Sequence, residues 1–406
     1  MNKPIDVVVF GATGFTGRLV AEVLTARGAS DQGLVWALAG RSASKLQAVR
    51  RAIGAPDSVP LIEADATDPA ALARLVAQAR VVITTVGPYQ RHGEALVKAC
   101  AEVGTDYVDL CGEPVWMARM IPLLQAPAQA SGARIVFSCG FDSVPFDLGV
   151  VFLQAEAQRR FGAPLARVHG RVRRMKGGVS GGTAASLLAT LDEIERDPAA
   201  ARTMADPFAL TPGFRGPTQP DGDGAVYDDL AQSWTGPFFM AAINTKNVHR
   251  SNALRGHPWG TDFCYDERLL LGDGLAGRAK AELLASATRL QNGLLAFGAS
   301  RRLLGRLVLP QPGQGPSLRQ REAGSYDLLF IGQTADGRVL HATVHGDRDP
   351  GYGSTSKMIV EAALCLAQDV DRGHTSGGVW TAGAAMGLAL LRRLEANAGL
   401  SFKLVD

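Results

Sequence analysis

The feature that most constrains this chain is a glycine-spaced turn near its amino terminus, set between a buried strand and a helix. Four apolar residues at 7–10, three of them β-branched, predict a strand that is buried on both faces, as in a parallel sheet. Glycines follow at positions 11, 14 and 17, and an amphipathic run over 18–27 predicts a helix that ends at Gly28. The chain therefore opens with a strand–turn–helix unit of an α/β fold.

Each glycine of this turn has its own physical reason. Gly11 permits the tight strand-to-helix turn, Gly14 lets the backbone approach a pyrophosphate, and Gly17 lets the helix pack closely on the sheet. The helix N-terminus then offers free N–H groups and a positive dipole end to phosphates. The spacing is GxxGxxG, a variant of the dinucleotide-binding turn, and a glycine-rich turn of another α/β domain is the alternative. The predicted cofactor-binding residues of this turn are Gly11, Ala12, Thr13, Gly14, Phe15, Thr16 and Gly17.

The end of the predicted second strand, at 34–39, favours NADP over NAD. Most NAD-specific domains carry Asp or Glu at this point to bind the ribose 2′-hydroxyl, whereas this chain carries Arg41. Ser42 adjoins it and Lys45 follows one helical turn later. A guanidinium here can bind a 2′-phosphate through two hydrogen bonds. The alternative is that Arg41 caps the solvated start of a helix.

The ends of the next two strands carry further candidate residues. Strand 61–64 leads into Asp65 and Ala66, where the carboxylate either faces the adenine edge or caps the helix predicted around 69–79. Strand 81–86 ends in a rigid turn, Gly87-Pro88, at the edge of the sheet where ligands of such folds bind. Tyr89 then lies near the nicotinamide or covers the sheet edge, and both interpretations stay open.

Two more strands complete the first domain. They are predicted at 107–110 and 134–138, so that six strands with intervening helices form a doubly wound parallel sheet. Glu113 follows the fifth strand, where it holds a ribose or a substrate amine or is a first-turn acid of the next helix. Asp142 and Ser143 follow the sixth strand, where they border the cleft.

From residue 146 the pattern changes to a second, α+β domain. A helix over 146–161 and a strand over 168–175 lead to Lys176 and a glycine-rich stretch that opens a helix ending near Arg196. That stretch is either a second anion-binding turn or a flexible loop over the active site. Over residues 197–235 the sequence predicts a long, irregular surface segment or a lid. A helix over 238–254 carries grouped polar side chains, which form a solvated face or a stripe that faces the substrate.

The remaining segments include one unusual stretch. Residues 269–309 are apolar and basic with few acids, which predicts one or two amphipathic helices for a membrane surface or a substrate entrance, or a helical hairpin packed on the second domain. Asp336-Gly337 joins two predicted strands, 325–334 and 339–346. Helices predicted to Asp369 and over 382–396 return to the first domain, with no strand after them. The predicted domains are 1–145, 146–350 and 351–406.

Composition excludes several other classes of protein. The net charge is +3 with acids and bases intermixed, so no nucleic-acid surface is predicted. The five cysteines are scattered without metal-ligand spacing, which predicts a reducing compartment and no metal site. No apolar run is long enough to span a membrane, and no signal peptide precedes the first strand. We therefore expect a cytoplasmic protein, with peripheral membrane contact through 269–309 as the one membrane alternative.

Eight stretches along the chain carry a family pattern: GATGFTG (11–17), AGR (39–41), VGPY (86–89), YVDLCGE (107–113), FDSVPFDLG (141–149), SGGT (180–183), INTKNVHRSNAL (243–254) and GYGSTSKMIVEAAL (351–364). Together they resemble the saccharopine dehydrogenase-like oxidoreductases, including the group called trans-acting enoyl reductases. The resemblance implies a Rossmann domain for NADP, a second α/β domain and dimerisation through that second domain. It assigns cofactor binding to residues 11–17, Arg41, Asp65 and the turn Val86-Gly87-Pro88.

These observations predict an NADPH-dependent reductase that passes a hydride to an electron-poor carbon of an enoyl or related lipid-like substrate. Tyr89, Asp142 and Lys176 are the hypotheses for its proton donor. No tyrosine has a lysine four residues later, which argues against a short-chain dehydrogenase mechanism. Two alternatives remain: a saccharopine-type dehydrogenase for an amino or imino acid, and a nucleotide-binding, lipid-associated protein with little catalysis.

Overall fold

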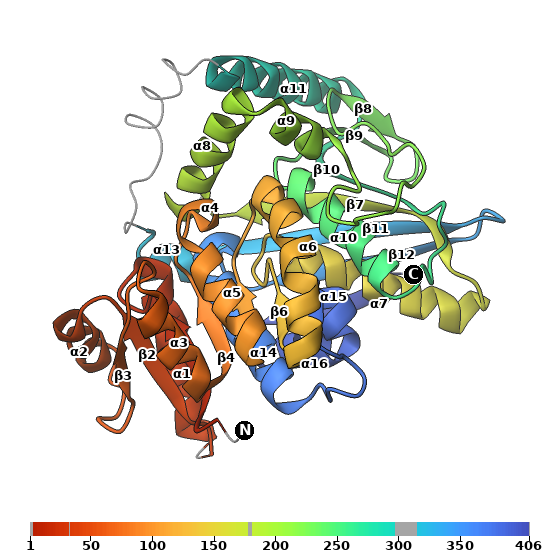
Figure 1. Cartoon of the computed structure of the whole chain (residues 1–406). Coiled ribbons are helices and arrows are strands. Elements are labelled where there is room, and N and C mark those ends of the chain that lie inside the picture. The colour runs from red at the N-terminus through yellow and green to blue at the C-terminus, as the bar shows by residue number, and fades with distance from the viewer. Residues whose placement is uncertain (1–2, 32, 178–180, 297–314, 406) are drawn as a thin grey trace.

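Two seven-stranded sheets, each with its own helices, make up the molecule (Figure 1). The computed structural model describes residues 3–31, 33–177, 181–296 and 315–405. The first sheet has the order β13-β6-β5-β4-β1-β2-β3 and is parallel throughout, and the second has the order β14-β12-β11-β7-β10-β9-β8 and is mixed. The predicted α/β class, with a Rossmann-type parallel sheet and a second α+β unit, is confirmed.

The first sheet forms because its strands are short runs of apolar residues buried on both faces. Its central strand β1 is buried at five of its six residues. The strands are β1 (Ile5–Phe10), β2 (Trp36–Gly40), β3 (Leu61–Glu63), β4 (Ala79–Thr84), β5 (Asp106–Asp109), β6 (Arg134–Val136) and β13 (Gly378–Trp380).

Helices cover both faces of this sheet. One face carries α1 and α14, which pack on each other, and the other carries α3, α5 and α6. The helices of this part are α1 (Phe15–Ser30), α2 (Ala43–Ala52), α3 (Pro69–Gln78), α4 (Tyr89–His92), α5 (Glu94–Val103), α6 (Pro114–Ser131) and α14 (Thr355–Gln368). The helix predicted to end at Gly28 continues to Ser30, because Gly28 keeps helical backbone geometry and leaves room for the Trp36 ring.

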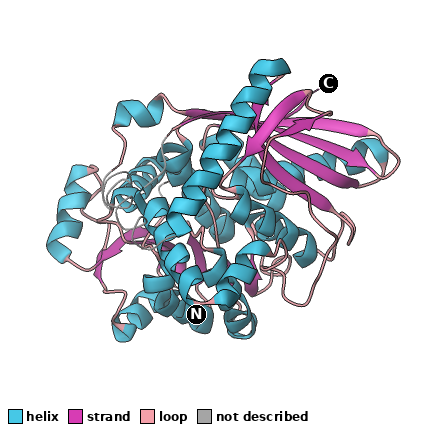
Figure 2. Cartoon of the chain, turned by 90° about the horizontal axis from the view of Figure 1, so that it is seen from above, coloured by secondary structure: helices cyan, strands magenta, loops and turns pink. Residues whose placement is uncertain are grey.

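The second sheet extends to one side of the helices and carries the C-terminus (Figure 2). Its strands are β7 (Leu165–Lys176), β8 (Val226–Asp228), β9 (Ser233–Pro237), β10 (Cys264–Gly272), β11 (Ser325–Thr334), β12 (Val339–Gly346) and β14 (Leu400–Val405). The helical elements of this part are α7 (Val144–Phe161), α8 (Gly181–Arg196), α9 (Pro198–Ala205), α10 (Ala241–Leu254), α11 (Gly274–Ala296), α13 (Leu318–Glu322), η1 (Pro350–Ser354), α15 (Ala382–Ala385) and α16 (Gly387–Asn397). The hairpin predicted around Asp336-Gly337 is confirmed over both of its strands.

The structure corrects four predictions in the second half of the chain. The segment 197–235 is not one irregular excursion, because it contains α9, β8 and the start of β9. Residues 269–272 belong to β10, so the predicted amphipathic helix begins at Gly274, and 297–309 lie outside the described residues. The polar side chains of α10 are buried rather than solvated. A strand, β14, does follow the last helices and pairs with β12.

The C-terminal third of the chain is shared between the two sheets. Helix α14 packs on β4 and β5, and β13 adds a seventh parallel strand beside β6, which the predicted count of six strands missed. The chain then returns through α16 to the second sheet. No helix among the described residues is long and apolar enough to cross a membrane. The predicted domain boundaries stay a prediction.

Candidate cofactor and active site

The predicted cofactor residues follow the carboxyl ends of adjacent parallel strands. The order β3-β2-β1-β4-β5-β6 brings the loops after these strands to one edge of the first sheet. In a doubly wound sheet a dinucleotide binds along this edge, with the adenosine toward the β2 side and the nicotinamide beyond the switch point. Arg41 therefore lies at the adenosine end, and the loops after β4, β5 and β6 lie at the nicotinamide end.

The glycine turn is as tight as the spacing predicts. Gly11 has a positive φ of 89°, and a Cβ atom on it would stand 2.6 Å from Cγ2 of Val86. A Cβ on Gly17 would stand 2.1 Å from the carbonyl oxygen of Gly11, so α1 lies directly against the end of β1. A Cβ on Gly14 would meet only that same oxygen, at 3.3 Å. The packing of the protein thus requires glycine at 11 and 17, whereas a Cβ at 14 would need only a small shift of the Gly11 carbonyl.

The first turn of α1 has free N–H groups. Gly14 is the N-cap residue and supplies no side-chain cap, so the N–H groups of Phe15 and Thr16 point out of the helix start. The Phe15 ring turns away to pack edge-on against Tyr352, with ring centroids 4.9 Å apart. Ala12 is buried, and Thr13 and Gly14 are exposed. This cradle fits a pyrophosphate bound by backbone groups.

Arg41 is exposed directly after β2 and does not cap the helix that follows. That role belongs to Ser42, whose Oγ accepts from the N–H of Lys45 at 3.4 Å. Hydrogen bonds from the hydroxyl and the N–H of Thr67 lower the pKa of Asp65, and the nearby charge of Arg41 lowers it further. Asp65 therefore lies beside Arg41 at this end of the edge. It does not cap α3, because that cap is Asp68, which accepts from the N–H of Ala70 at 3.0 Å.

A cavity of about 380 Å³ lies beside Asp65, between the loop after β3 and helices α4 and α5. Ala66 forms part of its wall, and three basic side chains contribute to the lining on the helix side. Its lining residues are Ala66, Thr67, Arg91, His92, Glu94, Ala95 and Lys98.

Glu113 organises the turn after β4. Its buried carboxylate accepts from the N–H groups of Tyr89 and Gln90, at 2.9 and 2.8 Å, and from the Ser186 hydroxyl of α8 at 2.6 Å. It therefore holds the start of α4, directly after Val86-Gly87-Pro88, and joins it to the second half of the chain. None of the three predicted roles for Glu113, in binding a ribose, in binding a substrate amine or as a first-turn acid of the next helix, described this cap on α4.

Tyr89 is buried, and its hydroxyl is engaged on both sides. It donates to the carbonyl of Thr84 at 3.2 Å and accepts from the N–H of Leu110 at 3.0 Å. Burial raises the pKa of Tyr89 well above its usual range. This geometry agrees with the interpretation in which Tyr89 covers the sheet edge.

Asp142 differs from these groups because its carboxyl makes no hydrogen bond to any residue that the structure describes. It is half-buried on the loop after β6, and a Cβ on Gly112 would stand 3.7 Å from its Oδ2. Burial raises the pKa of Asp142 to about 7. A carboxyl group with this pKa is half protonated at neutral pH, which is the property of a general acid.

Lys176 is exposed at the end of β7. Residues 178–180, in the middle of the predicted second anion-binding turn, lie outside the described residues, and α8 begins at Gly181. The structure also brings in Asp109, which sequence reasoning did not single out. Its carboxylate accepts from the N–H of Ser138 at 2.9 Å and from the Tyr107 hydroxyl at 3.0 Å. The signal for Asp109 was a carboxylate at the end of an otherwise apolar strand. Among the described residues there is no cluster that could hold a metal ion.

Comparisons with known proteins identify the first domain and the family of the chain. Residues 7–136 match the saccharopine dehydrogenase NADP-binding domain. A Mycobacterium tuberculosis protein, whose name assigns it provisionally to the trans-acting enoyl reductases, is 43% identical over 99% of this chain and 97% of its own. Proteins called trans-acting enoyl reductase in Mycobacterium bovis and Mycobacterium ulcerans are each 40% identical over 97% of this chain and 96% of theirs.

A solved structure shares the whole fold. The apo saccharopine dehydrogenase (L-Glu forming) of Saccharomyces cerevisiae superposes with a TM-score of 0.56 at 14% identity, over 99% of this chain and 100% of that one. A parallel sheet with an NADP-binding turn, joined to this second sheet, defines an NADP-dependent oxidoreductase of the saccharopine dehydrogenase type. Within that class, the chain belongs to the family of the trans-acting enoyl reductases.

Proposed function

We propose that the protein reduces the carbon–carbon double bond of an enoyl thioester or a related lipid-like substrate, and that Asp142 donates the proton. The observation that carries the proposal is the half-buried Asp142 carboxyl, with a pKa of about 7, at the nicotinamide end of the cofactor edge. The names of the 40–43% identical relatives support the substrate class.

The cofactor is held by the turn 11–17 and by the loops on either side of it. The N–H groups at the start of α1 bind the pyrophosphate, and Arg41 with Ser42 and Lys45 binds the 2′-phosphate. Asp65 and Ala66 border the adenine, and Val86-Gly87-Pro88 borders the nicotinamide. When bound, NADPH supplies the hydride that the reduction needs.

The chain's own groups orient the substrate and complete the reaction. Hydride addition to the β-carbon leaves negative charge on the α-carbon and the thioester oxygen, and one proton has to reach the α-carbon. Asp142 holds that proton below pH 7 and delivers it, so that NADPH, one proton and the enoyl thioester are consumed together. The Tyr89 hydroxyl and the Lys176 ammonium are weaker candidates for this step, because the Tyr89 hydroxyl already donates to the carbonyl of Thr84 and Lys176 is exposed at a strand end.

The test compares Asp142→Asn with Tyr89→Phe, using NADPH and enoyl-CoA thioesters of short and long chain. We expect Asp142→Asn to lower kcat by about a hundredfold or more with NADPH binding unchanged, and Tyr89→Phe to keep turnover within a fewfold. The wild-type kcat falls as pH rises through about 7, because Asp142 loses its proton there. Full activity of Asp142→Asn, or no enoyl reduction by the wild type, contradicts the proposal.

Helix α11 supports contact with a lipid-like surface. It lies at the outside of the molecule (Figure 1), and Leu275, Leu283 and Leu290 are 85, 72 and 66% exposed along one stripe. Arg278, Lys280 and Arg289 flank the stripe against a single acid, Glu282. Apolar side chains between cations are the pattern of a helix that binds an anionic membrane surface. A contact between two copies of the chain would use the same stripe.

Vesicle co-sedimentation separates these two partners. We expect the wild type to sediment with vesicles that contain phosphatidylglycerol, and Leu283→Glu to reduce the bound fraction severalfold. Leu123→Glu, which changes an exposed leucine on α6, is the matched control. If the wild type stays in the supernatant but forms a dimer that Leu283→Glu dissociates, the stripe is a contact between copies.

A further inference from the structure

We infer that Asn244 and Asn247 of α10 are positioning residues: they hold the strained backbone of Ser143 and thereby aim the carboxyl of Asp142. The inference rests on the proposed function of Asp142. It assigns a role to a buried polar helix face that the cofactor site leaves unexplained.

Ser143 has a backbone conformation that a side chain disfavours. Its φ is +133° with ψ −32°, and it directly follows Asp142 and precedes α7. Residues other than glycine are rarely found there, and such strain persists only where surrounding contacts impose it. The contacts around Ser143 therefore fix the backbone next to Asp142 and with it the orientation of the Asp142 side chain.

Two asparagines supply these contacts. The Ser143 Oγ accepts from Nδ2 of Asn247 at 2.7 Å and donates to Oδ1 of Asn244 at 3.1 Å. All three side chains are buried, with 3% of Ser143, 0% of Asn244 and 2% of Asn247 exposed. Their spacing on α10 is i and i+3, so both asparagines lie on the same face of the helix.

Asn244 is itself held from the second sheet. Nδ2 of Asn244 donates to Oε2 of Glu267 at 2.9 Å, and the Tyr265 hydroxyl donates to Oε1 of the same carboxyl at 2.9 Å. Glu267 and Tyr265 are buried on β10. A hydrogen-bond chain thus runs from the second sheet through α10 to the residue next to Asp142.

The other parts of the Asp142 loop are held from the first sheet and from α14. Ser138, at φ +60°, donates its N–H to Asp109 at 2.9 Å, and Phe141 donates its N–H to Oγ1 of Thr355 at 3.0 Å. The loop is therefore fixed at Ser138, Phe141 and Ser143. Asp142 is left with a carboxyl that no described residue binds and whose direction the anchors determine.

The decisive experiment compares Ser143→Ala with Ser143→Gly. Both remove the hydroxyl and its two hydrogen bonds, but only glycine adopts φ +133° without strain. If the bonds serve to hold this backbone, Ser143→Ala lowers kcat by about ten- to a hundredfold and shifts the pH at which kcat falls, whereas Ser143→Gly stays within a fewfold of wild type. NADPH affinity stays unchanged in both.

A second pair of variants tests the asparagine directly. Asn247→Ala removes the amide group that donates a hydrogen bond to the Ser143 hydroxyl. We therefore expect it to lower kcat in the same way as Ser143→Ala. The double variant Asn247→Ala/Ser143→Gly recovers most of that loss. Equal losses in Ser143→Ala and Ser143→Gly, or no loss in Ser143→Ala and Asn247→Ala, overturn the inference. Thermal unfolding of each variant shows which of them fold.

An infrared titration keeps this result separate from the proposed function. The band of the protonated Asp142 carboxyl is assigned as the one missing in Asp142→Asn, and its midpoint is followed with pH. We expect the midpoint to move in Ser143→Ala and Asn247→Ala but not in Ser143→Gly, whatever the reaction. A midpoint that is the same in all variants overturns the positioning role, while an Asp142→Asn enzyme of full activity removes only the catalytic role.

Discussion

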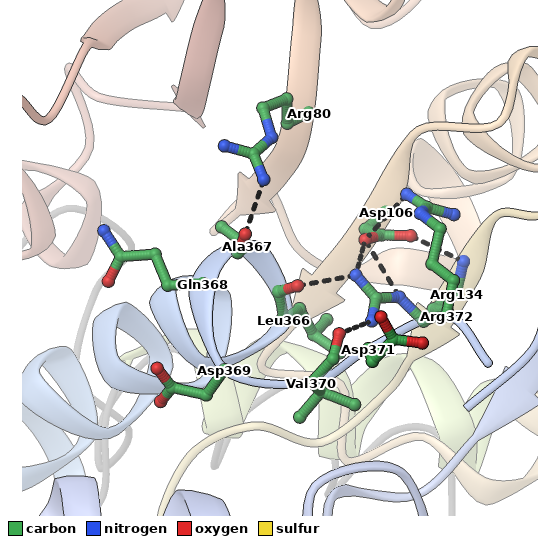
Figure 3. Close-up of a pocket in the computed structure, with 10 residues that line it drawn as sticks. All are labelled: Arg80, Asp106, Arg134, Leu366, Ala367, Gln368, Asp369, Val370, Asp371 and Arg372. Carbon is green, nitrogen blue, oxygen red and sulfur yellow. Dashed lines mark hydrogen bonds and ion pairs between the residues drawn. The ribbon is translucent and has the colours of Figure 1, made fainter. Parts of the chain in front are cut away.

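Arg134 and Asp106 form a buried ion pair (Figure 3). They are the first residues of β6 and β5, so the pair lies at the amino-terminal edge of the first sheet, opposite the cofactor edge. The Arg134 Nε donates to Asp106 at 3.0 Å, and its Nη1 and Nη2 donate to the carbonyls of Val370 and Leu366, at 2.8 and 2.6 Å. One guanidinium thus joins the adjacent strands β5 and β6 to the end of α14. The pair ties the C-terminal part of the chain to the first sheet.

Removing this guanidinium is expected to destabilise the fold strongly. Arg134→Met removes the buried cation that pairs with the Asp106 carboxylate and leaves the half-exposed Arg372 paired with it, so we expect the free energy of unfolding to fall by about 3–5 kcal/mol. Arg372→Ala is the control: its side chain is half exposed, and the expected loss is about 1 kcal/mol or less. Urea unfolding measures the free energy of unfolding of both variants. Equal losses would show that the buried ion pair stabilises the fold no more than the exposed one.

The glycine turn predicts a difference between two small substitutions. Gly17→Ala places a Cβ against the Gly11 carbonyl, so α1 has to shift, and we expect both a lower Tm and weaker NADPH binding. Gly14→Ala meets nothing closer than 3.3 Å, so its Tm stays near wild type while NADPH binding falls by about tenfold or more. Thermal unfolding and nicotinamide fluorescence titration give the two readings. Unchanged NADPH binding in Gly14→Ala would mean that no phosphate approaches this position.

Arg41 is expected to set the choice between the two nicotinamide cofactors. Loss of a guanidinium that binds the 2′-phosphate weakens NADPH binding by about ten- to a hundredfold in Arg41→Ala and leaves NADH binding nearly the same. Arg51→Ala, an exposed arginine at the far end of α2, serves as the control for net charge. Equal affinity of Arg41→Ala and wild type for NADPH would remove the assignment.

Stability is expected to depend on pH through Glu267. Burial raises its pKa to about 8, above the value of about 4.5 for an unfolded glutamate, so the folded state binds the extra proton between these pH values. Its contribution is complete at low pH and is lost as pH rises from about 4.5 through about 8, with a slope of up to about 1.4 kcal/mol per pH unit. Glu267→Gln should flatten this part of the curve, measured by urea unfolding from pH 5 to 8.5. If the stability of Glu267→Gln depends on pH as steeply as that of the wild type, another group causes the dependence. Asp109 is one such group, because burial raises its pKa to about 7.

Local sequence patterns predicted the elements that carry the cofactor site. The strand at 7–10 and the helix after the glycine turn appear where the patterns place them, and so do the hairpin strands 325–334 and 339–346 of the second sheet. Their signals are local: runs of β-branched residues, helical periodicity, and glycine where the backbone has to turn. The same holds for Gly11 and Gly17, whose steric requirement follows from the strand–turn–helix order alone.

Other features depended on pairings between distant parts of the chain. The strand β13 has three residues and joins the first sheet only because α14 brings it beside β6, and β14 joins the second sheet because α16 returns the chain there. Such short segments carry little periodicity of their own, so no local pattern distinguishes them from loops.

The sequence by itself thus determined the fold class, the NADP-binding turn and the family resemblance, because each depends on residues close together in the chain. Only the tertiary structure decided that the polar face of α10 is buried against Ser143, and that Tyr89 is enclosed while the Asp142 carboxyl has no hydrogen-bond partner in the part of the chain that the structure describes. The physical reason is that burial and a shifted pKa are properties of an environment built by several elements. Ser143 and Asn244 are 101 residues apart, and no periodicity encodes their contact.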